Sequence, residues 1–181
     1  PVGQWFNATA TTGRSIEALV SFHAATGDAA AMDLAQRLAE VHLRHTLDPR
    51  GKVRAELLDP HHVGHNHSYL GTLRGLLLYG IASGERKCVD AVAQTYRQGL
   101  WGTTTSHSGW TPHDQGKTRF PDSAGDPVGE HASCGDVAQL ALWLALRAGH
   151  TDALDDVERL VRARLLPSQL ADANDPRRDG A

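Results

Sequence analysis

Residues 146–163, LRAGHTDALDDVERLVRA, carry the signal that decides the fold. An apolar helical pattern ends just before Gly149, and an amphipathic pattern begins within a few residues of it. Glycine at such a point supplies the positive φ of a helix C-cap, and a short connection then joins two antiparallel helices. The stretch therefore predicts a helical hairpin whose tip lies at Gly149.

Two earlier stretches have the same form: 24–40, AATGDAAAMDLAQRLAE, and 81–98, IASGERKCVDAVAQTYRQ. In all three, an Asp follows six residues after the glycine (Asp33, Asp90 and Asp155). The tip glycines Gly27, Gly84 and Gly149 are 57 and 65 residues apart. Repetition at such a spacing predicts three consecutive helical hairpins, built from repeated units.

The two helices of each predicted hairpin differ in their apolar pattern. Residues 137–148 are apolar almost all round, which predicts a buried inner helix. Residues 155–166 have one apolar stripe and a charged opposite face, which predicts an outer helix. The inner pattern recurs over 70–81, and 15–25 with 29–45 give the opening pair. The predicted fold class is therefore all-α.

Alternating inner and outer helices are typical of an α/α toroid of hairpins. At roughly 60 residues per hairpin, a closed ring of six needs about twice this chain. We therefore expect about half of a six-hairpin barrel, either a fragment or an arc completed by another copy in a homo-oligomer. A start at Pro1 without Met favours a fragment or a processed product. We expect one domain over 1–170 and a frayed tail over 171–181; an independent six-helix bundle is the alternative.

The composition excludes several classes of protein. A hydrophobic content of 40%, 6% aromatic residues and a net charge of -3 describe a globular chain. Lys and Arg are scattered among Asp and Glu and form no basic cluster in the sequence, so nucleic-acid binding is not predicted. The longest apolar runs, such as 140–146, are too short to cross a membrane. Two cysteines make no disulfide framework, and the compartment, cytoplasmic or secreted, stays undecided.

The stretch 54–70, RAELLDPHHVGHNHSYL, holds four histidines within seven residues, His61, His62, His65 and His67. Imidazole is the side chain most readily poised for proton transfer near neutral pH. We therefore take His65 and His67 as catalytic candidates and His62 as a substrate contact. Their spacing is compatible with zinc ligation, although no recognised zinc motif accompanies it. The alternative is that each histidine only caps or hydrogen-bonds a helix start.

A second polar segment, 102–133, is expected to meet the first one. In an array of hairpins the long loops emerge at the same end, so segments 53–67 and 102–134 should form a cleft. Indole faces beside imidazoles and carboxylates suit a carbohydrate. The predicted substrate contacts here are Trp110, His107 and His113, and Asp114 and Glu130 are predicted catalytic carboxylates. The alternative is that Trp110 only packs the loop.

The segment EHASCGD, residues 130–136, opens the third inner helix. A helix N-terminus lowers the pKa of a thiol, so Cys134 is a candidate thiolate or metal ligand beside Glu130. Alternatively, Ser133 or Asp136 is the N-cap and Cys134 is a small buried residue. The other cysteine, Cys88, occupies the position that Ala31 and Ala153 have in the other repeats, which predicts a packing site.

Several of these motifs together resemble a known family. In order, they are the histidine-rich loop, SYLGTLRGLLLYGIASGE at 68–85, GW at 109–110, E-x3-C-G-D at 130–136 and DDVERLVRARLLPSQL at 155–170. This order is similar to the catalytic toroid of beta-L-arabinofuranosidase-like glycoside hydrolases, over roughly residues 53–170. The resemblance implies a six-hairpin barrel, zinc bound by a Glu and several Cys, a Cys nucleophile and a further Glu as acid/base.

The resemblance assigns the metal and catalytic roles to Glu130 and Cys134, which match the Glu and Cys that enter this helix in the family. Here three residues separate them, whereas one separates them in the family, and the later paired cysteines are absent from this sequence. The thiolate and zinc chemistry is thus the part of the family pattern from which this chain departs.

The sequence therefore predicts a glycoside hydrolase-like enzyme that acts on an oligo- or polysaccharide. Hydrolysis usually uses two carboxylates that flank the bond, with candidates Glu130, Asp114 and Asp136. The same toroid also hosts polysaccharide lyases, in which His or Tyr removes the proton α to a uronate carboxylate and Asn, His or Arg neutralises that carboxylate. The residues available for a lyase are His65, Asn66, His67, Tyr69 and Arg74. Of these, Tyr69 and Arg74 are predicted substrate contacts.

Two further alternatives remain at the level of the sequence. One is a non-catalytic helical-repeat module that binds a partner through its loops. The other is a regulatory or prenyl-type toroid, which the low aromatic content disfavours because such an interior is lined with aromatic side chains.

Overall fold

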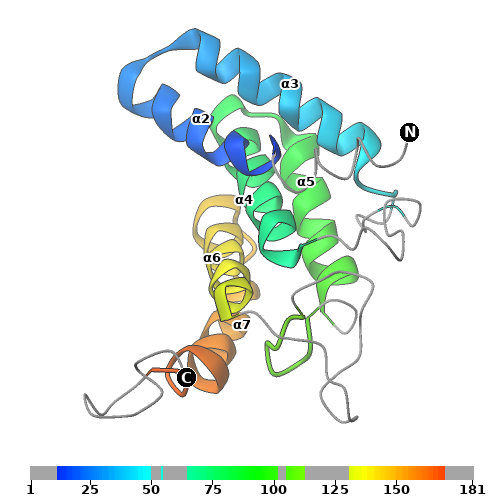
Figure 1. Ribbon diagram of the computed structural model, residues 1–181, viewed down its shortest axis with the longest axis vertical. Helices are drawn as coiled ribbons and strands as arrows, with labels where there is room; N and C mark the ends of the chain where they lie inside the picture. The colour runs from blue at the N-terminus through cyan, green and yellow to red at the C-terminus, as the bar shows by residue number, and fades with distance from the viewer. Residues whose placement is uncertain (1–11, 50–53, 55–64, 102–104, 113–130, 170–181) are drawn as a thin grey trace.

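The computed structural model describes residues 12–49, 54, 65–101, 105–112 and 131–169, without the side chain of His131. Within these ranges the chain is helical and forms no strand, which confirms the predicted all-α class (Figure 1). The elements are α2 (Arg14–Thr26), α3 (Ala29–His45), α4 (Asn66–Ser83), α5 (Arg86–Gln94), η3 (Thr95–Leu100), α6 (His131–Ala148), α7 (Ala153–Leu160) and η4 (Val161–Leu165). The two η segments are wide final turns that continue α5 and α7.

Three glycines form the tips that join α2 to α3, α4 to α5 and α6 to α7, as predicted. Gly27, Gly84 and Gly149 have φ values of 75°, 76° and 82°. A Cβ atom added at any of them would meet no atom within 4 Å, so the positive φ and not crowding requires glycine there. After the first tip, the Asp28 carboxylate accepts hydrogen bonds from the Ala30 and Ala31 backbone N–H groups and starts α3.

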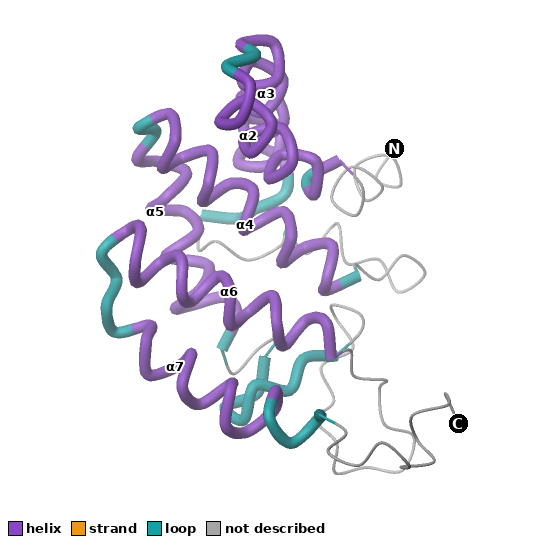
Figure 2. Tube along the Cα trace, turned by 90° about the vertical axis from the view of Figure 1, so that its left-hand side faces the viewer, coloured by secondary structure: helices purple, strands orange, loops and turns teal. Residues whose placement is uncertain are grey.

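The hairpins lie side by side, with α4 between α2 and α6 (Figure 2). Helix α4 is buried on nearly all sides, with thirteen of its eighteen residues buried, as its apolar pattern predicts. Gly75 permits the close approach of α2, because a Cβ there would lie 2.8 Å from Ile16 Cβ and 3.0 Å from the Glu17 nitrogen. We call α2, α4 and α6 the inner helices, and their outer partners are α3, α5 and α7.

One hydrophobic core runs through all three hairpins. Its largest fully buried apolar side chains are Ile16, Leu70, Leu73, Leu76, Leu77, Val92, Leu100, Val137, Leu140, Leu144 and Leu160. Cys88 is fully buried, and Ala31 and Ala153 at the equivalent positions are also buried. The prediction that Cys88 occupies a packing site is confirmed.

The start of the third inner helix differs from the prediction. Helix α6 begins at His131, so Ser133 and Asp136 lie inside the helix and neither is its N-cap. The N-cap interpretation of these two residues is therefore wrong. Both side chains are buried against neighbouring helices, and packing there outweighs the weak helix propensity of this polar segment.

Three consecutive hairpins are consistent with an arc of a toroid, and closure of the ring stays a prediction. The predictions for 1–11, 55–64, 113–130 and the tail 171–181 lie outside the described residues. None of the described helices is both long and apolar enough to cross a membrane.

Candidate functional site

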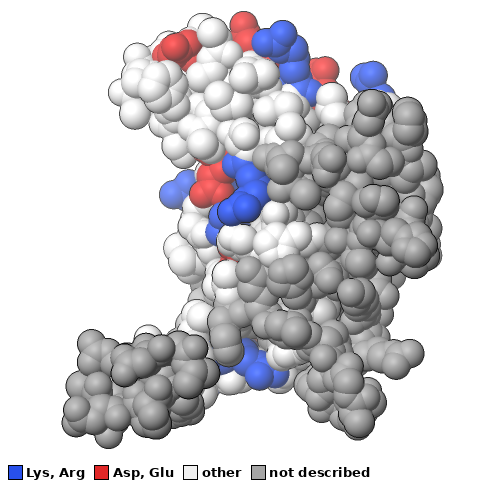
Figure 3. Space-filling model, viewed as in Figure 1, with Lys and Arg blue, Asp and Glu red and all other residues white. Residues whose placement is uncertain are grey.

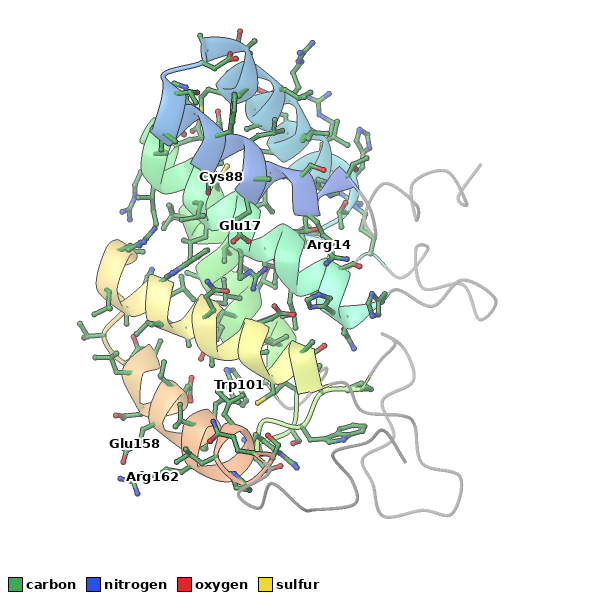
Figure 4. The ribbon with its side chains drawn as sticks, turned by 60° about the vertical axis from the view of Figure 1, so that its left-hand side comes forward. Arg14, Glu17, Cys88, Trp101, Glu158 and Arg162 are labelled. Atoms are coloured by element: carbon green, nitrogen blue, oxygen red, sulfur yellow. The ribbon has the colours of Figure 1, made fainter. Side chains whose placement is uncertain are left out.

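The N-terminal halves of the inner helices meet at the end of the molecule opposite the hairpin tips (Figure 2). They bring together six polar residues, which we call the inner-helix network: Arg14 and Glu17 of α2, His67 and Arg74 of α4, and Asp136 and Gln139 of α6. Figure 4 shows Arg14 and Glu17 on the side of α2 that faces α4. Positive and negative side chains also gather between α2 and α6 on the face seen in Figure 3.

The spacing within each helix explains why these side chains share one side. Residues three apart are neighbours on a helix surface, and residues seven apart lie almost two full turns apart on the same face. His67 and Arg74 are seven apart, and both are half-buried in a helix that is otherwise largely buried. The two residues of α2 and the two residues of α6 are each three apart.

Arg74 connects all three inner helices. Its Nε donates to Glu17 Oε2 at 3.1 Å, and its Nη1 donates to Asp136 Oδ1 at 2.7 Å and to Gln139 Oε1 at 2.6 Å. The Arg74 and Asp136 side chains are only 17% and 5% exposed. A buried carboxylate is costly unless it is paired, and the Arg74 guanidinium provides that pairing for Asp136 between the helices.

His67 uses both ring nitrogens in the network. Its Nδ1 hydrogen-bonds Asp136 Oδ2, and its Nε2 lies 3.1 Å from Arg14 Nη2. An ionised carboxylate only accepts and a guanidinium only donates, so these partners fix the neutral tautomer with the proton on Nδ1. The Nε2 lone pair therefore points to Arg14, in a side chain that is 25% exposed. This arrangement makes Nε2 a base within reach of solvent.

The neighbours of His67 come from the two polar segments that the sequence singled out. His65 Nδ1 lies 2.9 Å from Ser68 Oγ, and the His65 ring packs edge-on against His67 with centroids 5.8 Å apart. Asn66 is buried, and its Nδ2 donates to the Pro112 carbonyl at 2.7 Å. The start of α4 is therefore tied directly to the segment that follows α5.

The structure places His107 and Trp110 in a turn beside α7 and η4. His107 is exposed, and Trp110 is half-buried with its backbone N–H donating to Ser106 Oγ at 3.0 Å. Arg164 holds this turn by donating to the Ser108 carbonyl at 3.1 Å. Their role in substrate binding stays a prediction.

Tyr69 and Cys134 are both buried away from the surface of the network. Burial raises the pKa of the Tyr69 hydroxyl far above its usual value, helped by the charge of Asp48 and opposed by a hydrogen bond to Thr95. Burial also raises the pKa of the Cys134 thiol, which the charge of Arg164 only partly opposes. This direction favours the thiol form of Cys134, whereas a cysteine nucleophile acts as a thiolate.

The zinc site that the resemblance implies stays a prediction, because Glu130, one of its two proposed ligands, lies outside the described residues. In the described ranges, no group of three or more His, Cys, Asp and Glu side chains is arranged to hold a metal ion. The other candidates for chemistry, His62, His113, Asp114 and Glu130, lie outside the described residues.

Sequence reasoning missed three members of the network, Arg14, Glu17 and Gln139. A usable signal was present for two of them, since Arg14 and Glu17 are charged residues in the first turn of α2, whereas Gln139 lies in the third turn of α6. Asp136 had been noticed only as a candidate carboxylate or cap, and its partner His67 is 69 residues away.

Comparison of the chain with protein-family models, with curated proteins and with solved structures finds no match.

Proposed function

We propose that the protein is a carbohydrate-active enzyme of glycoside hydrolase type, with the inner-helix network as its catalytic centre. The observation that carries the proposal is His67, whose Nδ1 is bound to Asp136 while its Nε2 faces the exposed Arg14. A neutral imidazole in this setting is a general base near neutral pH. The buried carboxylate stabilises the imidazolium that forms when the base takes a proton.

In the hydrolytic step, His67 Nε2 removes a proton from a water molecule as the water oxygen bonds to the anomeric carbon. The bond between that carbon and the glycosidic oxygen breaks, and the leaving oxygen takes a proton from a general acid. We assign the acid to Glu130, which the sequence places in the segment that precedes α6. Trp110 is the proposed stacking surface for a sugar ring, because aromatic faces suit the CH faces of sugars.

A polysaccharide lyase is the second candidate, and one observation favours it. The Arg14 guanidinium lies directly at the base, 3.1 Å from Nε2. In a lyase the base removes the proton α to a uronate carboxylate, the electrons form a C=C bond, and the glycosidic oxygen leaves. A cation next to the base would stabilise the negative charge that develops on the carboxylate.

The test is an assay of the purified protein against a panel of neutral and acidic polysaccharides. We expect reducing ends to appear without ultraviolet absorbance for a hydrolase, and with the absorbance of an unsaturated uronate for a lyase. Folded protein that cleaves no member of the panel would refute the enzyme proposal and favour a non-catalytic binding module.

Replacing His67 with Gln keeps a polar side chain of similar size but removes the base. We expect the rate to fall by about 10²- to 10⁴-fold, the usual contribution of a general base. The matched control is His23→Gln, because His23 lies near the C-terminal end of α2, where its ring Nδ1 hydrogen-bonds the Asp28 carbonyl. Unchanged activity in His67→Gln, with activity present in the wild type, would exclude His67 as the base.

A further inference from the structure

Arg14 differs from the other arginine of the network in its partners. Arg74 pairs with both network carboxylates, Glu17 and Asp136. Arg14 is exposed and donates to the neutral His67 Nε2, and no described carboxylate lies in ion-pair distance of it. The charges of the two arginines and two carboxylates balance, but both carboxylates pair with Arg74. The Arg14 charge therefore has no carboxylate partner among the described residues, and it lies at the exposed edge of the network.

The Arg14 contact also blocks the base. While Arg14 Nη2 donates to Nε2, the lone pair that would remove a proton is occupied. A guanidinium binds a carboxylate more strongly than a neutral imidazole, because both partners are charged and two parallel hydrogen bonds can form. A carboxylate that reaches Arg14 would thus replace His67 as its hydrogen-bond acceptor.

We infer that Arg14 selects substrates that carry a carboxylate, a uronic acid unit, and that binding of this group to Arg14 frees His67 Nε2 to act. The inference rests on the proposed function, because it takes His67 as the base of a carbohydrate-cleaving enzyme. Arg14 is then a specificity-determining residue, and recognition of the acidic sugar is coupled to exposure of the base.

The other groups around His67 do not compete for this role. On α6, Asp136 is saturated by His67 and Arg74. On α2, Glu17 is paired with Arg74. On α4, His65 touches the His67 ring edge-on and bonds Ser68. Arg14 is therefore the group that an incoming anion can take without breaking an ion pair seen in the described residues.

The test is nitrogen NMR of the full chain labelled with 15N-histidine, because the Nε2 chemical shift reports whether its lone pair accepts a hydrogen bond. The probe is a trimer of galacturonate, with the galactose trimer as its neutral match. We expect galacturonate to move the His67 Nε2 signal to the position of a lone pair without a donor, and the galactose trimer to leave it in place. Equal shifts with both trimers, or no shift with galacturonate, would overturn the inference.

Variants separate the arginine from the rest of the surface. Arg14→Gln should place the Nε2 signal at the freed position without sugar and weaken galacturonate binding at least tenfold. Arg14→Lys should weaken galacturonate binding less, because lysine keeps the positive charge but cannot form the two parallel hydrogen bonds of a guanidinium. The control is Arg147→Gln, an exposed arginine at the far end of α6, which should bind as the wild type does. Wild-type affinity in Arg14→Gln would overturn the inference.

Two further results distinguish the anion and the activity. Inorganic sulfate that moves Nε2 as strongly as galacturonate at equal concentration would overturn the assignment to a carboxylate. Galacturonate that frees Nε2, without cleavage of any polyuronate, would support the recognition by Arg14 and refute the proposed enzyme. Cleavage of neutral polysaccharides alone, with no Nε2 shift, would support the enzyme and refute the uronate specificity.

Discussion

Two polar clusters of similar composition lie at different depths in this molecule. The inner-helix network joins α2, α4 and α6, and an outer cluster of Tyr96, Trp101, Asp156 and Arg159 joins η3 to α7. In the outer cluster, Tyr96 donates to Asp156 at 2.5 Å, Arg159 also pairs with Asp156, and the Arg159 guanidinium lies 4.7 Å from the centre of the Trp101 ring. In each cluster an Asp carboxylate therefore lies between an arginine and a ring: Asp136 in the inner-helix network and Asp156 in the outer cluster.

The difference is what remains available for chemistry. Burial raises the pKa of the Tyr96 hydroxyl to about 12, so it stays a donor and offers no base near neutral pH. His67 keeps a basic lone pair whose partner is an exposed arginine. A similar set of residue types thus connects two elements in one place, and in the other it holds the histidine that we propose as the base.

The largest effect on stability is expected from Arg74→Met. This change leaves the buried Asp136 carboxylate without its cation, which costs about 3–5 kcal/mol of unfolding free energy. Chemical denaturation measures it, and the matched control is Arg162→Met, which removes only an exposed pair with Glu158 and should cost less than about 1 kcal/mol. The double variant Arg74→Met, Asp136→Asn should regain part of the loss. Equal stability of Arg74→Met and Arg162→Met would show that the network is not buried.

A smaller effect on stability is expected from the titration of His42, which is fully buried, whereas His67 is only half-buried. Burial lowers the pKa of His42 from 6.5 to about 4, and its Nδ1 bonds Thr46 Oγ1 at 3.0 Å. Between these pH values the unfolded chain binds the proton and the folded chain does not, so stability is complete above pH 6.5 and falls as the pH drops. The loss by pH 4 is about 3 kcal/mol.

The measurement is the unfolding free energy of wild type and His42→Gln between pH 4 and 7. The Gln variant keeps a polar partner for Thr46 but cannot titrate, so the difference between the two curves isolates His42. A difference that is constant across this pH range would contradict the assignment.

The smallest effect is expected from Tyr96→Phe in the outer cluster. It removes one hydrogen bond to Asp156, worth about 1–2 kcal/mol, and should leave any carbohydrate-cleaving activity unchanged. Thermal unfolding and the cleavage assay measure the two quantities together. A loss of activity as large as that of His67→Gln would remove the distinction between the two clusters.

The sequence predicted the elements better than their contacts. The tips at Gly27, Gly84 and Gly149 were readable because positive φ after an apolar helix has a local signature. The start of α6 was not, because His131 to Asp136 is a polar segment whose helicity comes from packing. Periodicity identified α4 as buried, but it does not say which helix each face meets.

The site shows the same limit. His67 was found because histidines cluster in its segment, and Asp136 was found as a carboxylate near a helix start. That Asp136 orients His67, and that Arg14 occupies its other nitrogen, depends on pairs 69 and 53 residues apart. Contacts at that separation are set by the packing of α2, α4 and α6, for which a single sequence has no local signal.

Arg74 has one more consequence, for the way the molecule unfolds. In arrays of repeated hairpins each unit contacts mainly its neighbours, so such arrays can lose their terminal units one at a time. Arg74 belongs to the middle hairpin and bonds residues of the first and the third together. Unfolding of the first or the third hairpin therefore breaks an ion pair of Arg74, with Glu17 or with Asp136. The three hairpins should thus melt in a single cooperative transition.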